Sequence, residues 1–117
     1  MTLRECYARL DGDFEGTLGR LCNEKLVEKF ALKFLADDSF ALLEEAIAVG
    51  NYNDAFRAAH TLKGVSINLG FTQLYKVSDE MTEALRGGTE PENDTLLERV
   101  KDEYQRTVDL LQELQNG

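Results

Sequence analysis

The chain has 117 residues, 43% of them hydrophobic, and a net charge of −9 from 22 acidic residues against 13 lysines and arginines. This length is enough for one domain with its own core, whereas the acidity argues against nucleic acid and anionic membrane as partners. No apolar run approaches the roughly 20 residues of a membrane span, and residues 1–6 lack the apolar segment of a signal peptide. Cys6 and Cys22 form no metal-type cluster, which favours reduced thiols and a cytoplasmic protein.

The first third of the chain predicts two short helices and a longer one. Residues 2–5 have the spacing of a capping box, which predicts a helix that ends near Leu10. A turn at residues 11–13 separates it from a second short helix over 14–21. Asn23 can cap a longer helix, to about residue 35, whose apolar stripe we expect in the core: Leu26, Val27, Phe30 and Phe34.

The middle of the chain predicts two antiparallel helices. Residues 37–39 break the chain and offer an N-cap for a helix over 40–49, with Leu42, Leu43, Ala46 and Ile47 on its inner face. Gly50 and Asn51 then make a tight connection, which places the next helix antiparallel to this one. Asn53 is a good N-cap residue and Gly70 a good residue just past a helix end, so these two frame the next helix.

The last part of the chain predicts two more helices separated by a loop. Thr72 can cap a helix to about Arg86, a loop follows over 87–91, and Pro91 suits the first turn of a final helix that ends near Gln115. Their inward residues are Leu74, Val77, Met81, Leu85, Leu97, Val100, Tyr104, Leu111 and Leu114. No segment alternates as a strand does. The sequence therefore predicts one all-α domain over 1–117, in which an antiparallel four-helix bundle (23–116) carries short additional N-terminal helices (1–22).

The helix predicted over 53–70 has a regular apolar face and an unusual outward face. At about 100° per residue, the apolar side collects Ala55, Ala58, Leu62, Val65 and Leu69. The opposite side collects Asn53, Phe56, Arg57, His60, Lys63, Gly64 and Ile67. The chain's single histidine therefore lies at the middle of the outward face.

The neighbours of His60 indicate that a large partner approaches it. Glycine costs roughly 1 kcal/mol relative to alanine in a helix interior, so Gly64, one turn later, indicates steric clearance. Lys63 shares this face, and its ammonium group can reach a negative charge that is placed on the imidazole. Ile67 and Phe56 form an apolar rim that suits docking, although Phe56 equally fits packing against a neighbouring helix.

The charge pattern around this histidine differs from that of the whole chain. From residue 51 to residue 77 the only carboxylate is Asp54, whereas Arg57, Lys63 and Lys76 are cationic. We therefore expect a locally cationic surface, which favours a group that becomes anionic.

Two short runs of residues in this part of the chain resemble the sequence signature of a known family. The run Ala59-His60-Thr61-Leu62-Lys63-Gly64, followed by Asn68-Leu69-Gly70-Phe71, closely resembles the signature of histidine-containing phosphotransfer (HPt) domains. The resemblance is strongest over 50–71 and extends, as helix order and length, over nearly the whole chain. It implies the same bundle and a phosphocarrier rather than a stand-alone kinase. His60 would accept a phosphoryl group on Nε2 from a phospho-aspartate or a histidine kinase and donate it to a response regulator.

The resemblance also implies roles for the residues around the histidine. Lys63 would compensate the phosphoryl charge, while Mg²⁺ and an acidic pocket would belong to the partner's receiver domain. We therefore expect no cofactor and no metal site in this chain, and a monomer. Many family members hold the imidazole with a glutamine of the next helix, a position that falls near Thr82 here. Thr82 and Arg86 are candidates for orienting the ring or the phosphate, and both equally fit ordinary solvated residues. Arg57 completes the candidate binding set.

Three functions fit the sequence. The first is a phosphorelay carrier, and the second is an adaptor that binds a receiver domain through the same face without accepting phosphate. The third, a dimerisation segment of a histidine kinase, is disfavoured because the chain has no ATP-binding domain and its histidine helix is short for a dimeric hairpin. Without the motif, a lone histidine on a solvated helix face indicates only a polar surface residue. The lack of long disordered tails favours a free-standing protein over a fragment of a kinase.

Overall fold

The computed structural model describes all 117 residues and contains only helices. The elements are α1 (Leu3–Leu10), α2 (Phe14–Leu21), α3 (Glu24–Lys33), the 3-10 helix η1 (Phe34–Ala36), α4 (Ser39–Ala48), α5 (Tyr52–Asn68), α6 (Thr72–Ala84) and α7 (Leu96–Asn116). The predicted all-α fold is confirmed. None of the helices combines the length and the apolar character that crossing a membrane requires.

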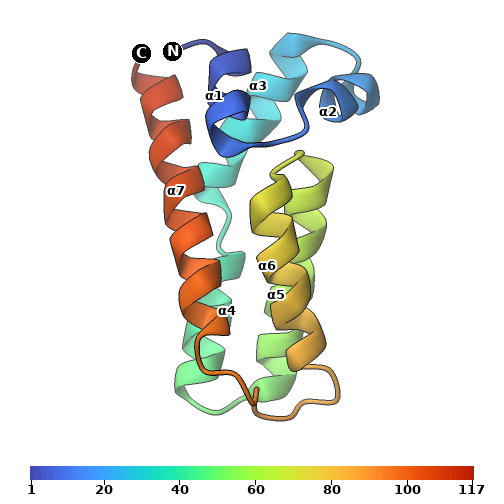
Figure 1. Ribbon diagram of the computed structural model, residues 1–117, viewed down its shortest axis with the longest axis vertical. Helices are drawn as coiled ribbons and strands as arrows, with labels where there is room; N and C mark the ends of the chain where they lie inside the picture. Colours follow the sequence, from blue (N-terminus) through green and yellow to red (C-terminus); the bar gives the residue numbers. More distant parts are fainter.

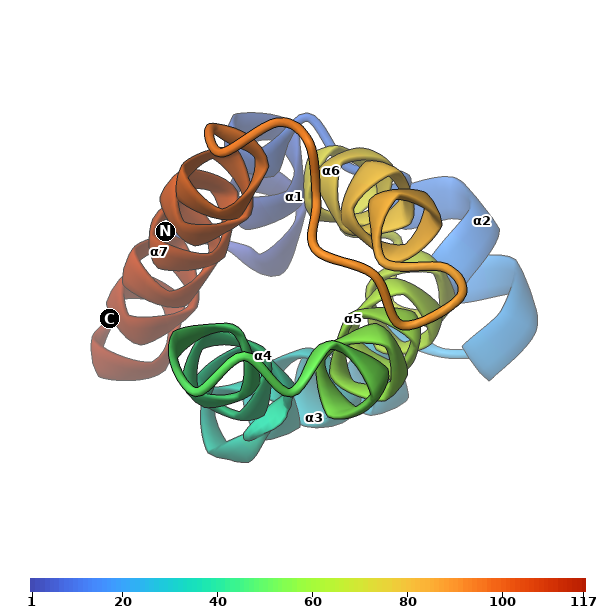
Figure 2. The ribbon, with the colours of Figure 1, turned by 90° about the horizontal axis from the view of Figure 1, so that it is seen from below.

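The long helices form an antiparallel bundle. Helix α5 packs against α4 on one side and α6 on the other, and α7 packs against α6, so the four helices form a ring in the end view (Figure 2). Helix α3 and η1 precede α4 in the chain and lie above it in Figure 1, toward the upper end of the molecule. Helices α1 and α2 lie at that end, where both termini are also found. We call residues 1–22, which contain α1 and α2, the N-terminal cap.

Several helix boundaries differ from those predicted. Helix α5 begins at Tyr52 because the side chain of Asn51, rather than that of Asn53, accepts the capping hydrogen bond from the Asp54 N–H. Gly50, at φ 74°, reverses the chain directly before this cap. The prediction of Asn53 as the N-cap is therefore wrong.

Two further caps and one buried position are also corrected. Phe71, not Thr72, is the N-cap residue of α6, and no side chain caps that helix. Helix α7 begins at Leu96, so Pro91 precedes it rather than forming its first turn. Leu42 is 49% exposed, because Phe40, with the correctly predicted Leu43 and Ala46, makes the inner face of α4.

A connected series of aromatic rings joins the N-terminal cap to the bundle. Each ring lies with its centroid 4.5–5.9 Å from the next, and most of the pairs meet edge to face, a geometry that adds to the apolar burial. The series runs through Phe14, Tyr7, Phe71, Phe34, Tyr104 and Phe40. The cap and the bundle therefore share one core.

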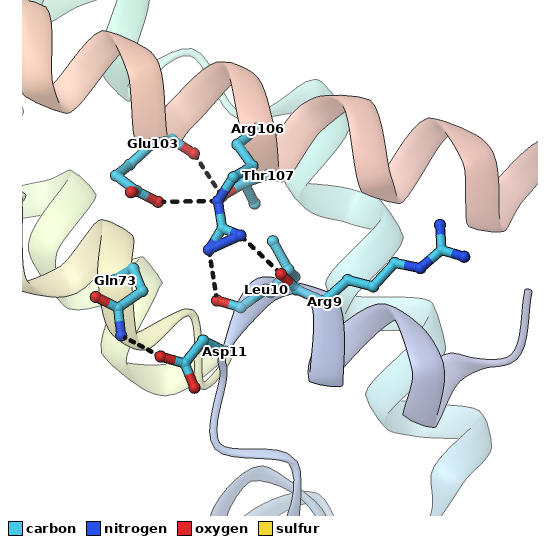
Figure 3. Close-up of polar contacts among 7 residues, drawn as sticks. All are labelled: Arg9, Leu10, Asp11, Gln73, Glu103, Arg106 and Thr107. Atoms are coloured by element: carbon cyan, nitrogen blue, oxygen red, sulfur yellow. Dashed lines mark hydrogen bonds and ion pairs between the residues drawn. The ribbon is translucent and has the colours of Figure 1, made fainter.

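Polar contacts fasten the carboxyl end of α1 to the bundle (Figure 3). Arg106 of α7 donates to the backbone carbonyls of Arg9 and Leu10, at 2.7 and 3.0 Å. Gln73 of α6 donates to the carboxylate of Asp11 at 3.1 Å. The last carbonyls of a helix have no partner within it, so Arg106 satisfies two groups that α1 itself cannot.

The N-terminal cap satisfies the carboxyl end of α5 in the same way. The carbonyls of residues 67–70 all accept hydrogen bonds from it. Arg20 donates to the first two at 3.1 and 3.0 Å, the Tyr7 hydroxyl to the third at 2.7 Å, and the Asp13 N–H to the fourth at 2.8 Å. Gly70 has φ 72°, and a Cβ there would collide with the Thr17 hydroxyl. We call this carboxyl end of α5 the closed end, because the N-terminal cap binds its last carbonyls and fills the space around Gly70.

Candidate functional site

His60 lies in the middle of α5, and its side chain is exposed. The helix turns its opposite face into the core, where Ala55, Ala58, Leu62 and Leu69 are buried as predicted, while Val65 is half-buried. Ala59 and Ser66 complete the buried face. The burial of one side of α5 therefore fixes the direction in which the imidazole points.

The space beside the imidazole is open at Gly64. Apart from its two chain neighbours and the backbone of its own helix turns, a Cβ built on this glycine meets no atom within 4 Å. Ile67, one turn further along, is 47% exposed. The fold therefore gives no internal reason for a glycine at this position, and the clearance is available to a visiting molecule.

Lys63 is held by a carboxylate of the neighbouring helix. Its ammonium lies 2.9 Å from the carboxylate of Asp79 on α6, and its side chain is only 25% exposed. The hydrogen bond to Asp79 raises the pKa of Lys63 above its ordinary value. The side chain therefore stays cationic and points toward α6.

A second cation reaches the site through Phe56. The guanidinium of Arg86 lies over the Phe56 ring, 5.3 Å from its centroid, and Phe56 in turn lies 6.0 Å from the imidazole, centroid to centroid. Nε and Nη2 of Arg86 donate to the carboxylate of Glu83, at 2.9 and 2.8 Å, and this pairing lowers the pKa of Glu83. Phe56 is half-buried, so it packs toward α6 and also borders the histidine.

A comparison with protein-family models matched the chain to the Hpt domain over residues 32–116. The chain belongs to the Hpt domain family. Membership gives it a phosphotransfer role in two-component signalling and confirms the resemblance seen in the sequence. Comparisons with curated proteins and with solved structures gave no match. The N-terminal cap precedes the matched region of this Hpt domain.

The cationic surface predicted around the histidine is largely neutralised by carboxylates. Arg57 is paired with Asp54 and Lys63 with Asp79 of α6. Lys76, the third cation of the predicted surface, is exposed and takes part in none of the nine ion pairs. Arg86, outside the predicted surface, is paired with Glu83. Sequence reasoning missed Asp79 and Glu83 because the charges were compared only as far as residue 77. Their spacing of four residues, on the helix that packs antiparallel to α5, was the signal that could have found them.

Thr82 does not have the position that the sequence comparison gave it. It is 1% exposed, and its hydroxyl donates to the carbonyl of Ser78 at 2.7 Å. Thr82 is therefore neither a solvated residue nor a group that reaches the imidazole. Arg86, one turn later, is exposed, and its guanidinium lies over the ring of Phe56, which borders the histidine.

The site of this Hpt domain is a surface rather than a pocket. A groove of about 680 Å³ lies between α2, α3 and the carboxyl end of α5, and another of about 450 Å³ lies between α4 and α5. Neither groove is lined by His60, Lys63 or Gly64. No group of three or more His, Cys, Asp or Glu side chains is arranged to hold a metal ion. This geometry suits a docked protein surface better than a small molecule.

Proposed function

We propose that this Hpt domain carries a phosphoryl group on His60, taking it from a sensor kinase or a receiver domain and giving it to a response regulator. The observation that carries the proposal is an exposed imidazole with open space at Gly64 on the same helix. Lys63 and Arg86 lie to one side of it, where they can compensate the incoming charge. The bundle supplies presentation and charge, and the partner supplies the rest of the active site.

The chemistry requires little from the bundle beyond a neutral imidazole. A neutral imidazole is a competent nucleophile toward an activated phosphorus. The lone pair of Nε2 forms a bond to phosphorus while the bond from phosphorus to the aspartyl oxygen breaks, and the carboxylate leaves with the bonding pair. The proton on Nδ1 stays on the ring or passes to water. Transfer to the next aspartate reverses these steps.

The surroundings of the histidine fit a receiver domain as the docked partner. Phe56 and Ile67 border the imidazole with apolar surface, and Arg57 extends the same face. A receiver brings its own Mg²⁺ and aspartate, so the carrier needs no cofactor of its own. Both cysteines are free, which supports a cytoplasmic setting, and the proposed form is a monomer.

Transfer of radiolabel from a set of phosphorylated receiver domains tests this function. We expect label on the wild type, labile in acid and stable in base, and no label on His60→Gln. Since His60 is the only histidine, such label identifies the site. Binding of a receiver without label on either protein would overturn the carrier and favour a receiver-binding adaptor that uses the same face.

A further inference from the structure

Two carboxylates of α6 hold two cations on the α6 side of the histidine helix. Asp79 binds Lys63, and Glu83, one turn later, binds Arg86. Among the cations of the nine ion pairs in the molecule, Lys63 is the least exposed. Its ammonium is therefore already committed to a partner before any phosphoryl group arrives.

Phosphorylation of the histidine changes the charge beside this ion pair. A phosphoryl group brings between about one and a half and two negative charges and three acceptor oxygens. Lys63 lies three residues from His60 on the same helix, a spacing at which side chains meet. The phosphoryl group and the Asp79 carboxylate then compete for one ammonium, and the two anions also repel each other.

We propose that Asp79 is a positioning residue that restrains Lys63 and thereby weakens the hold of His60 on the phosphoryl group. The inference rests on the proposed function. A carrier must release its phosphoryl group as well as accept it, and a cation free to bind the phosphoryl group would favour the loaded state. The Asp79 carboxylate opposes that preference. Exchange of Lys63 from Asp79 to the phosphoryl group accompanies loading, and the return of Lys63 to Asp79 accompanies release.

Phosphoramidate tests the proposal without a cognate receiver. In this reaction the imidazole forms a bond to phosphorus, the bond from phosphorus to the amino nitrogen breaks, and ammonia leaves with a proton from the medium. At a fixed ratio of phosphoramidate to ammonium, the initial rate measures how fast His60 is loaded, and the plateau ratio of loaded to unloaded protein measures how favourable phosphoryl-His60 is. Intact-protein mass gives both quantities.

Asp79→Asn keeps the shape of the side chain and removes its charge. We expect it to load about two- to fivefold faster than the wild type and to raise the ratio of loaded to unloaded protein by a similar factor, the range typical of one partly exposed ion pair. Asp79→Glu should restore wild-type values. Glu80→Gln is the matched control, because Glu80 lies on the same helix and binds Arg99 of α7 instead. It should load as the wild type does.

A second background separates positioning from general destabilisation. In Lys63→Met protein, Asp79→Asn should change loading much less than it does in the wild type, because the ammonium for which the anions compete is absent. Added salt should also reduce the difference between Asp79→Asn and the wild type. If Asp79 were merely structural, Asp79→Asn would lower the thermal stability. Its effect on loading would then be the same with and without Lys63, and at low and high salt.

The possible failures are distinguishable. If the wild type and His60→Gln both remain unloaded, the proposed function fails. If the wild type loads on His60 but Asp79→Asn loads no better than Glu80→Gln, or loads less well, the proposed function stands and the role of Asp79 is overturned. An undiminished effect of Asp79→Asn in the Lys63→Met background would contradict the partner exchange.

Discussion

Gly64 and Gly70 belong to the same signature, yet the structure uses them for opposite reasons. Around Gly70 the N-terminal cap approaches so closely that a Cβ would collide with it, and the backbone has φ 72°. Around Gly64 the backbone is helical, and no atom beyond its chain neighbours and its own helix turns lies within 4 Å of a Cβ. One end of α5 is closed by the protein itself, and its middle is left open for another molecule.

This difference separates structural from functional parts of the motif. The Leu69-Gly70 pair ends α5 and docks it on the N-terminal cap, so its role is to hold the helix. His60 and Gly64 lie on the open face, where the fold gains nothing from them. Substitutions at the closed end should therefore change stability, whereas substitutions on the open face should change transfer.

The largest effect is expected for Gly70→Ala. A non-glycine residue in the left-handed region costs roughly 1–2 kcal/mol, and forcing a Cβ against Thr17 adds about 1–3 kcal/mol of overpacking. We expect urea unfolding to show a loss of about 2–5 kcal/mol. Gly50→Ala is the control, since Gly50 has φ 74° but open space. An equal loss in both variants would contradict the close approach of the N-terminal cap.

The next largest effect is expected for alkaline pH, which should weaken the packing of the N-terminal cap. Cys6 is fully buried, and burial raises its pKa from 9.0 to about 11. The folded state therefore favours the protonated thiol, so this stability is complete below pH 9 and is lost as the pH rises to about 11. The loss amounts to about 3 kcal/mol. Burial also raises the pKa of Tyr7, which adds to the loss above pH 10.

Urea unfolding curves recorded about every pH unit between about pH 8 and about pH 11 measure how the free energy of unfolding falls. Cys6→Ala should lose the part of the decline that begins near pH 9, while Cys22→Ala, at an exposed position, should keep it. A decline that is unchanged in Cys6→Ala would show that the thiol is not its source.

A smaller loss is expected for Tyr7→Phe. The Tyr7 hydroxyl donates to the carbonyl of Leu69 in the interior, and a buried carbonyl without its donor costs about 1–2 kcal/mol. The same change at Tyr52, which is half-buried at the other end of α5, should cost less than about 0.5 kcal/mol. Thermal unfolding of the two variants gives the comparison, and similar losses would mean that the bond to Leu69 does not close the helix end.

Gly64→Ala should have the smallest effect on stability, and one of opposite sign. Alanine is favoured over glycine in a helix interior by roughly 1 kcal/mol, and nothing obstructs the added methyl. The variant should therefore be slightly more stable yet slower in phosphoryl transfer, and Gly64→Arg slower still. Gly19→Ala in α2, which also has open space, should gain stability without slower transfer. Unchanged transfer rates in both Gly64 variants would contradict the clearance.

The fold was largely predictable from the sequence because apolar spacing and caps are local signals. The capping box of Thr2 and Glu5 formed as predicted, as did the N-cap at Asn23. The exception at Asn51 and Asn53 arose because two equally good caps lie two residues apart. Which asparagine caps the helix depends on where Gly50 reverses the chain.

The position of the histidine was predictable for the same reason, but its electrostatics were not. His60 and Gly64 share one face of one helix, and helical periodicity alone brings them together. The Lys63–Asp79 pair joins residues of different helices, and its existence depends on the rotation of α6 against α5. The burial of Thr82 depends on the same rotation. Local patterns carry no information about that angle.

Phosphorus NMR of the protein after treatment with phosphoramidate tests the central claim most directly. Because the chain contains one histidine, we expect a single phosphohistidine resonance in folded wild-type protein and none in His60→Gln. The resonance should form more slowly in Gly64→Arg than in Gly19→Ala. A folded wild-type protein that shows no such resonance, or one that persists in His60→Gln, would contradict a phosphoryl group carried on the open face of α5.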